Sequence, residues 1–513
     1  MLLLSSIFLI AICALIYELI AGAVSSYLLG SSVTHFSLVI GLFLSAMGVG
    51  AYLTRFVRGD LLERFVQIEL LIGLVGGSSS LALFAAFTYA PALYMGVMVT
   101  VAGLVGTLIG MEVPLIIRVL EERSGGLRLT VANVMAVDYL GALLASLAFP
   151  LVLVPRLGLM RTAFAFGLLN VGVAWVGLLR FSATFRHPRA TRAAAALTAA
   201  LLALGFAGST RLLSLLESRV YPDEVLYAKD TPFQRVVVTR WGGDTRLFLN
   251  GALQFSSVDE RRYHEALVHP AMRRAAARAD VLILGGGDGL AAREVLGYPE
   301  VRRVDLVDID PEVTALFATR DLLSALNEGA LRDPRVHLHS QDAARFLAES
   351  ARSWDVVLID LPDPEGLEVG RLYSVETFAE VSKRLRPHGA LAAQSTSPFY
   401  AREAFWCVAR TLAATPTLGA GGEGRLHIRP YHINVPSFGE WGFVLAAPRA
   451  ETLTRPARPL PSTRVLTEES EAAMFIFDKD LSEPEGVEVN RLNDQPLVRY
   501  YRQSHQQFYG DRP

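Results

Sequence analysis

The sequence predicts an α-helical membrane bundle fused to a soluble α/β domain, in which a small β-rich section precedes a doubly wound parallel sheet. Three observations support this prediction. The 513 residues are 52% hydrophobic and only 19% charged, whereas soluble domains average about 25% charged residues. The long apolar runs all lie before Arg211, and strand and helix patterns alternate after it. Mean hydropathy is +0.35.

The composition also excludes several classes of protein. A net charge of −2 gives no general reason to expect nucleic-acid binding. Two cysteines, Cys13 and Cys407, exclude a disulfide scaffold and a Cys-rich zinc site. The high apolar content excludes a disordered or collagen-like chain.

The apolar runs have the length of membrane-spanning helices, which need about 20 mostly apolar residues. Six runs are long enough, at residues 2–30, 36–54, 66–89, 92–117, 131–154 and 162–179. A seventh, 193–208, is short and Ala-rich, so the predicted membrane domain (1–210) has six or seven helices. The first run lacks a basic leading segment and continues into the next, which predicts a retained helix rather than a signal peptide.

Arginines between the runs predict their orientation. The connectors after the second, fourth and sixth runs carry Arg55, Arg58, Arg64, Arg118, Arg123, Arg128, Arg180, Arg186, Arg189 and Arg192. Arg156 and Arg161 lie on the opposite side. This excess places the N-terminus in the cytoplasm. Six spans would then leave the second half of the chain inside and seven would leave it outside.

Three acids, Glu18, Glu112 and Asp138, fall within the predicted spans. A carboxylate at membrane depth is costly and usually faces a partner or a water-filled cavity. Two interpretations stay open. The acids form a cation or proton site, or they hydrogen-bond between helices as protonated or partnered groups.

The second half begins with a β-rich section, predicted at 215–255. Its strands are expected at 224–228, 234–240 and 246–249, with a hairpin turn at 241–244. From 256 to 447 the predicted strands are 281–284, 303–307, 336–339, 356–359 and 390–394. Helices are expected between them at 291–296, 311–319, 343–349 and 374–385. Residues 448–513 are predicted to be a linker and a charged tail.

Glycines and acids at strand ends predict a nucleoside site. The first strand runs into Gly285, Gly286, Gly287, Asp288 and Gly289, which permit a tight turn and close approach of a ligand. Acids end the next two strands. Asp308 lies 308 − 285 = 23 residues after the first glycine, as expected for a ribose-binding acid, and Asp342 is placed to meet an adenine amino group. Asp288 would repel phosphates or a carboxylate and attract a cationic ligand tail. The alternative is a turn with solvated acids.

The fourth strand ends in Asp360 and Asp363, a concentrated negative site whose expected guest is an amine. An aliphatic ammonium, with a pKa near the lysine value of about 10.4, cannot act as a nucleophile. A carboxylate that takes its proton would therefore act as a general base. The alternatives are a metal site and an ordinary Asp-Pro turn.

The second half resembles the spermidine synthase (polyamine aminopropyltransferase) family. The matching stretches are Asp230-Thr-Pro-Phe-Gln-Arg235, Leu249-Asn-Gly-Ala-Leu-Gln254, Asp259 with Tyr263-His-Glu265, 285–289, 307–310, 342–343 and 360–364. They follow the family's order over about 220–445, and the apolar half resembles the family's multi-pass bacterial branch.

The resemblance implies a Rossmann-like, class I methyltransferase-like sheet and a defined reaction. An aminopropyl group would pass from decarboxylated S-adenosylmethionine, a co-substrate, to putrescine or a related amine, giving spermidine and methylthioadenosine. The resemblance implies no tightly bound cofactor. We expect no metal, because no His lies near Asp360 and Asp363 in the sequence, and the net charge gives no reason to expect a nucleic-acid partner. It implies a homo-oligomer in the lipid bilayer of the cell membrane, and because the donor is made in the cytosol we expect the catalytic half there.

Residue by residue, the resemblance makes Asp360 the proton acceptor and Asp363 the residue that holds the acceptor amine. Other substrate contacts are implied for Tyr263, His264, Asp288, Gln234, Asp308, Asp342 and Ala343, of which the last four line the nucleoside, together with the glycines at 285–287 and 289.

The chain departs from the family pattern at the acceptor end. Asn250 stands for an aspartate, Phe233 for a tyrosine, and Leu367 for a common proline. The family's Pro-Thr-Tyr element becomes Pro436-Ser-Phe438, so a hydroxyl is missing unless Tyr431 supplies it. Longer or aromatic-tolerant amines therefore stay possible as acceptors.

Two other functions stay open. One is a membrane-bound methyltransferase that uses S-adenosylmethionine, against which Asp288 and the Asp360/Asp363 pair argue. The other is a polyamine transporter or sensor that binds ligand without chemistry, against which the intact Asp360 argues.

Overall fold

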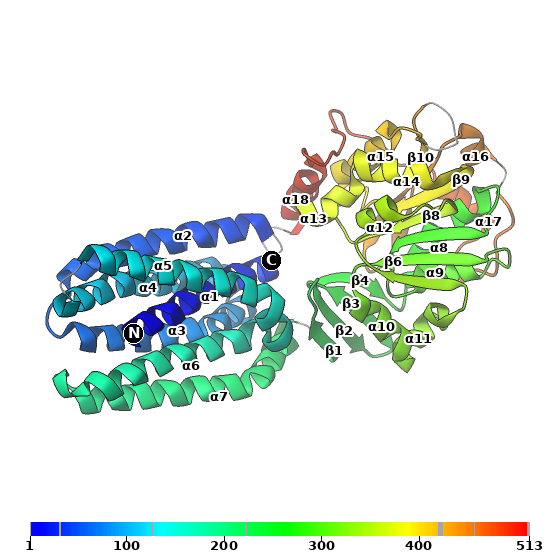
Figure 1. Ribbon diagram of the computed structural model, residues 1–513. Helices are drawn as coiled ribbons and strands as arrows, with labels where there is room; N and C mark the ends of the chain where they lie inside the picture. The colour runs from blue at the N-terminus through cyan, green and yellow to red at the C-terminus, as the bar shows by residue number, and fades with distance from the viewer. Residues whose placement is uncertain are drawn as a thin grey trace. The chain divides into compact units, whose positions relative to one another are not determined.

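A computed structural model describes residues 2–29, 32–124, 127–220, 223–418, 424–455 and 457–509 (Figure 1). The chain divides into two compact units, one ending at Glu224 and the other spanning residues 225–512.

The described part of the first unit contains seven long helices, each of 22 to 33 residues. They are α1 (Leu2–Leu29), α2 (Ser32–Leu53), α3 (Leu61–Tyr89), α4 (Tyr94–Ser124), α5 (Leu127–Ala148), α6 (Val154–Phe181) and α7 (Pro188–Val220). Buried apolar side chains from these helices form the core of the unit. The predicted helical bundle is confirmed.

Six helical stretches of this unit are long and apolar enough to cross a membrane. One of them, Val131–Thr184, has 54 residues, which as a straight helix would measure about 80 Å. It is broken at Gly158, whose backbone lies at φ 73° and ψ 172°. This stretch therefore contains the two spans predicted at 131–154 and 162–179.

The core of this unit contains a polar group that the sequence did not single out. Asn170 donates from Nδ2 to Oε2 of Glu69 at 2.9 Å and accepts at Oδ1 from the Tyr17 hydroxyl at 3.2 Å. Glu112, one of the three predicted intramembrane acids, lies beside Glu69 in this core. The network links α1, α3 and α6, so Glu69 hydrogen-bonds between helices.

The second unit begins with a small sheet in the order β1-β2-β3-β4. Its strands are β1 (Glu224–Asp230), β2 (Arg235–Trp241), β3 (Asp244–Leu249) and β4 (Ala252–Ser256). The sequence predicts the first three, and β4 was not predicted. Asn250 and Gly251 join β3 to β4 with positive φ of 51° and 86°, which suits an Asn-Gly hairpin turn.

The large sheet has the order β10-β11-β9-β8-β5-β6-β7. Its strands are β5 (Asp280–Gly285), β6 (Arg303–Asp308), β7 (Val336–Ser340), β8 (Trp354–Asp360), β9 (Leu385–Gln394), β10 (His427–Val435) and β11 (Gly439–Ala447). Strands β9-β8-β5-β6-β7 are parallel, as predicted, whereas β10 and β11 are antiparallel additions at one edge. The strand order reverses between β5 and β8, and open α/β sheets bind ligands at such a switch point.

Helices cover both faces of this sheet (Figure 1). The first face packs against α8 (Glu260–Arg274), α9 (Leu290–Leu296) and α10 (Pro311–Thr319). The second packs against α12 (Ala343–Glu349), α14 (Val375–Arg384) and α15 (Arg402–Ala414). Alternate residues of β5 serve the two cores, with Ile283 in the first and Leu284 in the second, as the two-residue period of a strand requires. The short helices α11 (Asp321–Leu326) and α13 (Leu367–Gly370) lie in connections.

The residues beyond 448, expected to be a linker and tail, pack against the sheet domain. They contain α16 (Ala450–Thr454), α17 (Glu468–Ala473) and α18 (Pro496–Tyr509). Glu265 accepts hydrogen bonds from three successive backbone amides at 464–466, at 2.8 to 3.0 Å, and Arg273 forms ion pairs with Glu468 and Glu471. The small sheet, the large sheet and these residues accordingly belong to one compact unit.

Candidate active site

The glycine-rich turn lies at the switch point between β5 and β8. Gly285 pairs with Asp360, and the amide of Gly286 donates to the Asp360 carbonyl at 3.1 Å. A Cβ atom on Gly286 would lie 2.9 Å from Oδ2 of Asp360, and one on Gly287 would lie 2.5 Å from Oδ2 of Asp308. The absence of these side chains therefore brings two predicted site acids, Asp360 and Asp308, against the turn. Gly289 closes it with φ 78° and starts α9.

Two backbone amides fix the Asp308 carboxylate at the end of β6. Gly287 donates to Oδ2 at 2.9 Å, and Asp310 donates to Oδ1 at 2.8 Å. Burial raises the pKa of Asp308 to about 6, and these two hydrogen bonds oppose the increase. In this orientation the Asp308 carboxylate can accept hydrogen bonds from a pair of neighbouring hydroxyls, because each of its oxygens keeps a further lone pair.

The loop before β2 docks on the same edge of the sheet. Gln234 donates from Nε2 to Oδ2 of Asp310 at 3.1 Å, and Thr231 donates to the same oxygen at 2.8 Å. Asp310 is fully buried and also caps α10 through the Glu312 amide at 3.0 Å. The structure thus brings Gln234 beside the end of β6, with Asp310 as a link that the sequence did not single out.

Asp342 follows β7 and begins α12. Its Oδ1 accepts from the Arg345 amide at 3.0 Å, and its Oδ2 accepts from Arg371 at 2.6 Å. Ala343 is buried directly after it. Asp342 therefore lies one strand beyond Asp308, in the predicted order, with both oxygens engaged by arginine residues.

The acid of β8 is held by a side chain from α8. The Tyr263 hydroxyl donates to Oδ1 of Asp360 at 2.7 Å. The Tyr263 ring packs against Phe438, Trp441 and Phe443, with centroids 5.3 to 6.4 Å away. An aromatic wall therefore fixes the tyrosine that orients Asp360.

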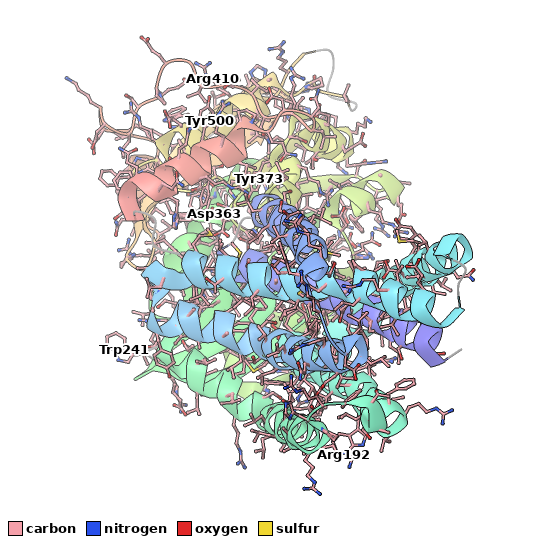
Figure 2. The ribbon with its side chains drawn as sticks, turned by 90° about the vertical axis from the view of Figure 1, so that its left-hand side faces the viewer. Arg192, Trp241, Asp363, Tyr373, Arg410 and Tyr500 are labelled. Atoms are coloured by element: carbon pink, nitrogen blue, oxygen red, sulfur yellow. The ribbon has the colours of Figure 1, made fainter. Side chains whose placement is uncertain are left out.

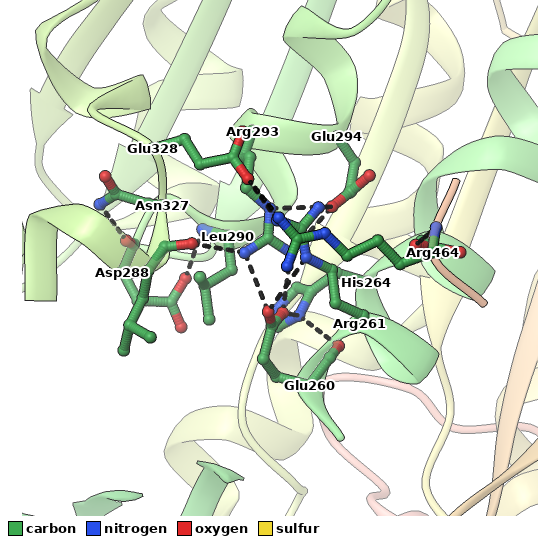
Figure 3. A network of polar contacts seen from close by, with 12 residues as sticks. Glu260, Arg261, His264, Asp288, Leu290, Arg293, Glu294, Asn327, Glu328 and Arg464 are labelled. Carbon is green, nitrogen blue, oxygen red and sulfur yellow. Dashed lines mark hydrogen bonds and ion pairs between the residues drawn. The ribbon is translucent and has the colours of Figure 1, made fainter. Parts of the chain in front are cut away.

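His264 belongs to a buried network of charges (Figure 3). Its Nδ1 lies 2.9 Å from Oε2 of Glu260, and Arg293 makes a bidentate ion pair with Glu260 at 2.8 and 2.9 Å. The sequence missed Glu260 and Arg293, although the four-residue spacing of Glu260 and His264 on one helix face was a signal.

This network keeps His264 protonated. Burial lowers the pKa of His264, but the hydrogen bond to Glu260 and the charges of Glu260, Asp288 and Asp360 raise it to about 9. Burial raises the pKa of Glu260, but hydrogen bonds and charge from His264 and Arg293 lower it to about 2. The site therefore contains a fixed imidazolium at neutral pH.

Asp288 and Asp360 lie in one site with this cation. Asp288 accepts at Oδ1 from the Leu290 amide at 2.9 Å, at the start of α9. Burial raises the pKa of Asp360, and it raises that of Asp288 to about 6, while the charge of His264 opposes both shifts. The two acids also repel one another. A carboxyl group with a raised pKa, beside a cation, is suited to accept a proton near neutral pH.

Asp363 lies in the loop after β8, beside α18. Its Oδ2 accepts from the Tyr501 hydroxyl at 2.9 Å, whereas its buried Oδ1 accepts no hydrogen bond from the described part of the chain. Burial raises the pKa of Asp363 to about 7, and the charge of Glu365 adds to the increase, whereas the Tyr501 hydrogen bond and the neighbouring Gln394 side chain oppose it. Gln394 and Tyr373 hold the loop by donating to the Leu361 carbonyl at 2.6 and 3.2 Å.

Tyr431 does not supply the missing hydroxyl at the acceptor end. Its hydroxyl donates to the Ala266 carbonyl at 3.0 Å, and its ring stacks on Phe443 in the core.

Among the described residues, no group of three or more His, Cys, Asp or Glu side chains is placed to hold a metal ion.

The His264 network predicts a pH-dependent stability. Because the pKa of His264 rises from about 6.5 in the unfolded chain to about 9 in the folded unit, its stabilisation is full below pH 6.5 and disappears as the pH rises through 9. Asparagine keeps a hydrogen-bond donor but does not titrate. We therefore expect the free energy of unfolding of the wild type to fall by about 3 kcal/mol more than that of His264→Asn as the pH rises from below 6.5 to above 9. Thermal unfolding of both proteins at pH 6.5, 8 and 9.5 measures it. Parallel curves would contradict a charged His264.

Comparison with known proteins places this geometry in context. The model of the spermine/spermidine synthase domain matches residues 260–451. Polyamine aminopropyltransferase 2 of Ralstonia nicotianae is 46% identical over 98% of both chains. The polyamine aminopropyltransferase of Leptospira interrogans is 44% identical over 97% of both chains. A solved spermidine synthase in complex with the transition state analogue AdoDATO is 24% identical, with a TM-score of 0.46 over 50% of this chain and 88% of that chain.

Proposed function

This chain belongs to the spermine/spermidine synthase family, and we propose that it transfers an aminopropyl group from decarboxylated S-adenosylmethionine to putrescine or a related amine. The products are spermidine and methylthioadenosine. The observation that carries the proposal is the position of Asp360 at the sheet's switch point, in one electrostatic site with Asp288 and His264.

Asp360 is the catalytic base in this proposal. It takes a proton from the acceptor ammonium, and the freed nitrogen attacks the carbon of the aminopropyl group that is bonded to the sulfonium. The new C–N bond forms as the C–S bond breaks, and the electron pair of the C–S bond returns to sulfur. The leaving thioether is neutral and needs no proton, so positioning and one base are sufficient.

The other acids bind the two substrates. Asp308 accepts from the ribose hydroxyls, with Gln234, Asp342 and Ala343 lining the nucleoside. Asp288 pairs with the terminal ammonium of the donor, which has lost its carboxylate. Asp363 holds the acceptor amine. Tyr263 orients Asp360 through their 2.7 Å hydrogen bond, and the His264 cation reduces the repulsion between Asp288 and Asp360.

A direct assay tests the reaction. The purified full chain in detergent is incubated with decarboxylated S-adenosylmethionine and a panel of diamines, longer polyamines and aromatic amines, and products are identified by mass. Methylthioadenosine with an aminopropylated amine supports the proposal. In a parallel assay S-adenosylmethionine replaces the decarboxylated donor, and a methylated product from it would indicate a methyltransferase. Binding of both ligands without any thioadenosine would indicate a sensor or transporter.

We propose further that the apolar unit spans the cell membrane and that the catalytic unit is cytoplasmic, where the donor is made. Seven crossings combined with the arginine distribution would instead place it outside. Fluorescent-protein and alkaline-phosphatase fusions at the C-terminus distinguish the two, with fusions after Arg58 as the control. Phosphatase activity without fluorescence would contradict the cytoplasmic placement.

Light scattering in detergent tests the homo-oligomer that the family resemblance implies.

A further inference from the structure

The helix α18 ends the described chain and reaches the acceptor end of the site. From it Tyr501 donates to Oδ2 of Asp363 at 2.9 Å, and Arg502 donates to the Glu365 carbonyl at 3.0 Å. Figure 2 shows α18 in red with Asp363 and Tyr373 labelled beside it. The helix lies outside residues 260–451, which the family model matches.

Buried contacts fix the position of α18. Leu497 and Val498 are 0% and 3% exposed. A Cβ atom on Gly370 would lie 2.5 Å from Cγ2 of Val498, so a glycine is needed where the helix meets α13. Just before the helix, Asn490 donates to the carbonyls of Gly370 and Tyr373 at 2.8 and 3.1 Å. The Tyr501 hydroxyl is therefore delivered to Asp363 by a packed element.

The two oxygens of Asp363 have different surroundings. Tyr501 occupies Oδ2, whereas Oδ1 is buried and accepts no hydrogen bond from the described residues. A buried carboxylate oxygen without a partner is costly, and an ammonium N–H is a well-matched donor for it. With Oδ2 held by Tyr501, Oδ1 is the oxygen of Asp363 that is left to accept from an ammonium.

The sequence departure in the acceptor region leaves room for this role. Phe438, which replaces the family's tyrosine, packs against Tyr263 in the site. Tyr431 directs its hydroxyl to the Ala266 carbonyl instead. Tyr501, unlike Tyr431, donates its hydroxyl to an acid of the acceptor end, Asp363.

We propose that Tyr501 is a positioning residue that sets the affinity and selectivity for the acceptor, a primary aliphatic amine, by orienting Asp363. This inference rests on the proposed aminopropyl transfer and adds to the active site an element from beyond the family domain. It predicts that the acceptor end of the site is formed only when α18 is in place.

The test compares Tyr501→Phe with Tyr500→Phe in the full chain in detergent. Tyr500 is a matched control, because it lies on the same helix and directs its hydroxyl to Glu488 at 3.1 Å. We expect Tyr501→Phe to raise the KM for putrescine about tenfold, the effect of losing one hydrogen bond to a charged group. The KM for the donor and kcat at saturating putrescine stay within about twofold, and Tyr500→Phe changes none of the three.

Further readouts separate positioning from folding. Tyr501→Phe combined with Asp363→Asn should add little to Asp363→Asn alone, since the hydroxyl acts through that carboxylate. An unchanged putrescine KM, an equal rise in both KM values, or the same effect from Tyr500→Phe would overturn the inference. Wild-type activity is measured first, so its absence counts against the proposed function alone. Putrescine binding by calorimetry then provides the same comparison of the two variants.

Discussion

Asp360→Asn is expected to lower kcat by about 10²- to 10⁴-fold, the range for loss of a general base. Asparagine matches aspartate in size and keeps an oxygen to accept from Tyr263, which bonds Asp360 at 2.7 Å, but it cannot take a proton from an ammonium. The donor contacts that we propose are made by Asp308 and Gln234, which lie on other elements, so the affinity for the donor should change little. Steady-state kinetics with calorimetric donor titration measures both effects.

The pH profile provides the control for this prediction. In the wild type, kcat is expected to fall as the pH decreases through the raised pKa of Asp360, because only the carboxylate can accept a proton. This decrease of kcat at low pH should be absent from the residual activity of Asp360→Asn. Asp363→Asn, three residues away, should chiefly raise the KM for the acceptor. Equal losses of kcat and donor affinity in Asp360→Asn would instead make Asp360 a binding residue.

The central strands were predictable because parallel strands buried on both faces are continuous apolar runs. The predicted strand 281–284 became β5 with one more residue at each end. Helix α8 was not predicted, because charged groups such as Glu260, Glu265 and Arg273 are buried in it through distant partners. Its sequence therefore lacks the apolar period of an amphipathic helix. The antiparallel pair β10 and β11 lacked the alternation with helices on which the prediction depended.

The site was predictable to the extent that position along the chain determines it. Asp308 and Asp360 are the last residues of the apolar strands β6 and β8, so the sheet alone places them at one edge. Partners from distant segments gave no such signal. Arg293 is 33 residues from Glu260, and Tyr501 is 138 residues from Asp363. Glu69 was overlooked inside an apolar run, and its pairing with Asn170 of α6 became visible only in the folded bundle.

Gly287→Ala is expected to raise the KM for decarboxylated S-adenosylmethionine about 10- to 100-fold, while kcat at saturation changes much less. The new Cβ atom would lie 2.5 Å from Oδ2 of Asp308, so the carboxylate must move and lose its 2.9 Å hydrogen bond from the Gly287 amide. The ribose would then lose hydrogen bonds to a charged group, each contributing about 1.5–3 kcal/mol. Gly287 does not adopt a positive φ, so alanine adds this collision without backbone strain.

Two variants make the Gly287 result specific. Gly243→Ala lies in the β2–β3 turn, where a Cβ atom meets nothing within 4 Å, and should leave both KM values unchanged. Asp308→Asn should reproduce the donor effect by a different route, because it removes the charge and leaves the turn intact. A normal donor KM in both Gly287→Ala and Asp308→Asn would mean that the nucleoside does not bind at the end of β6. The donor would then not be bound next to the base Asp360, so this pair of variants tests whether the whole reaction takes place at this edge of the sheet.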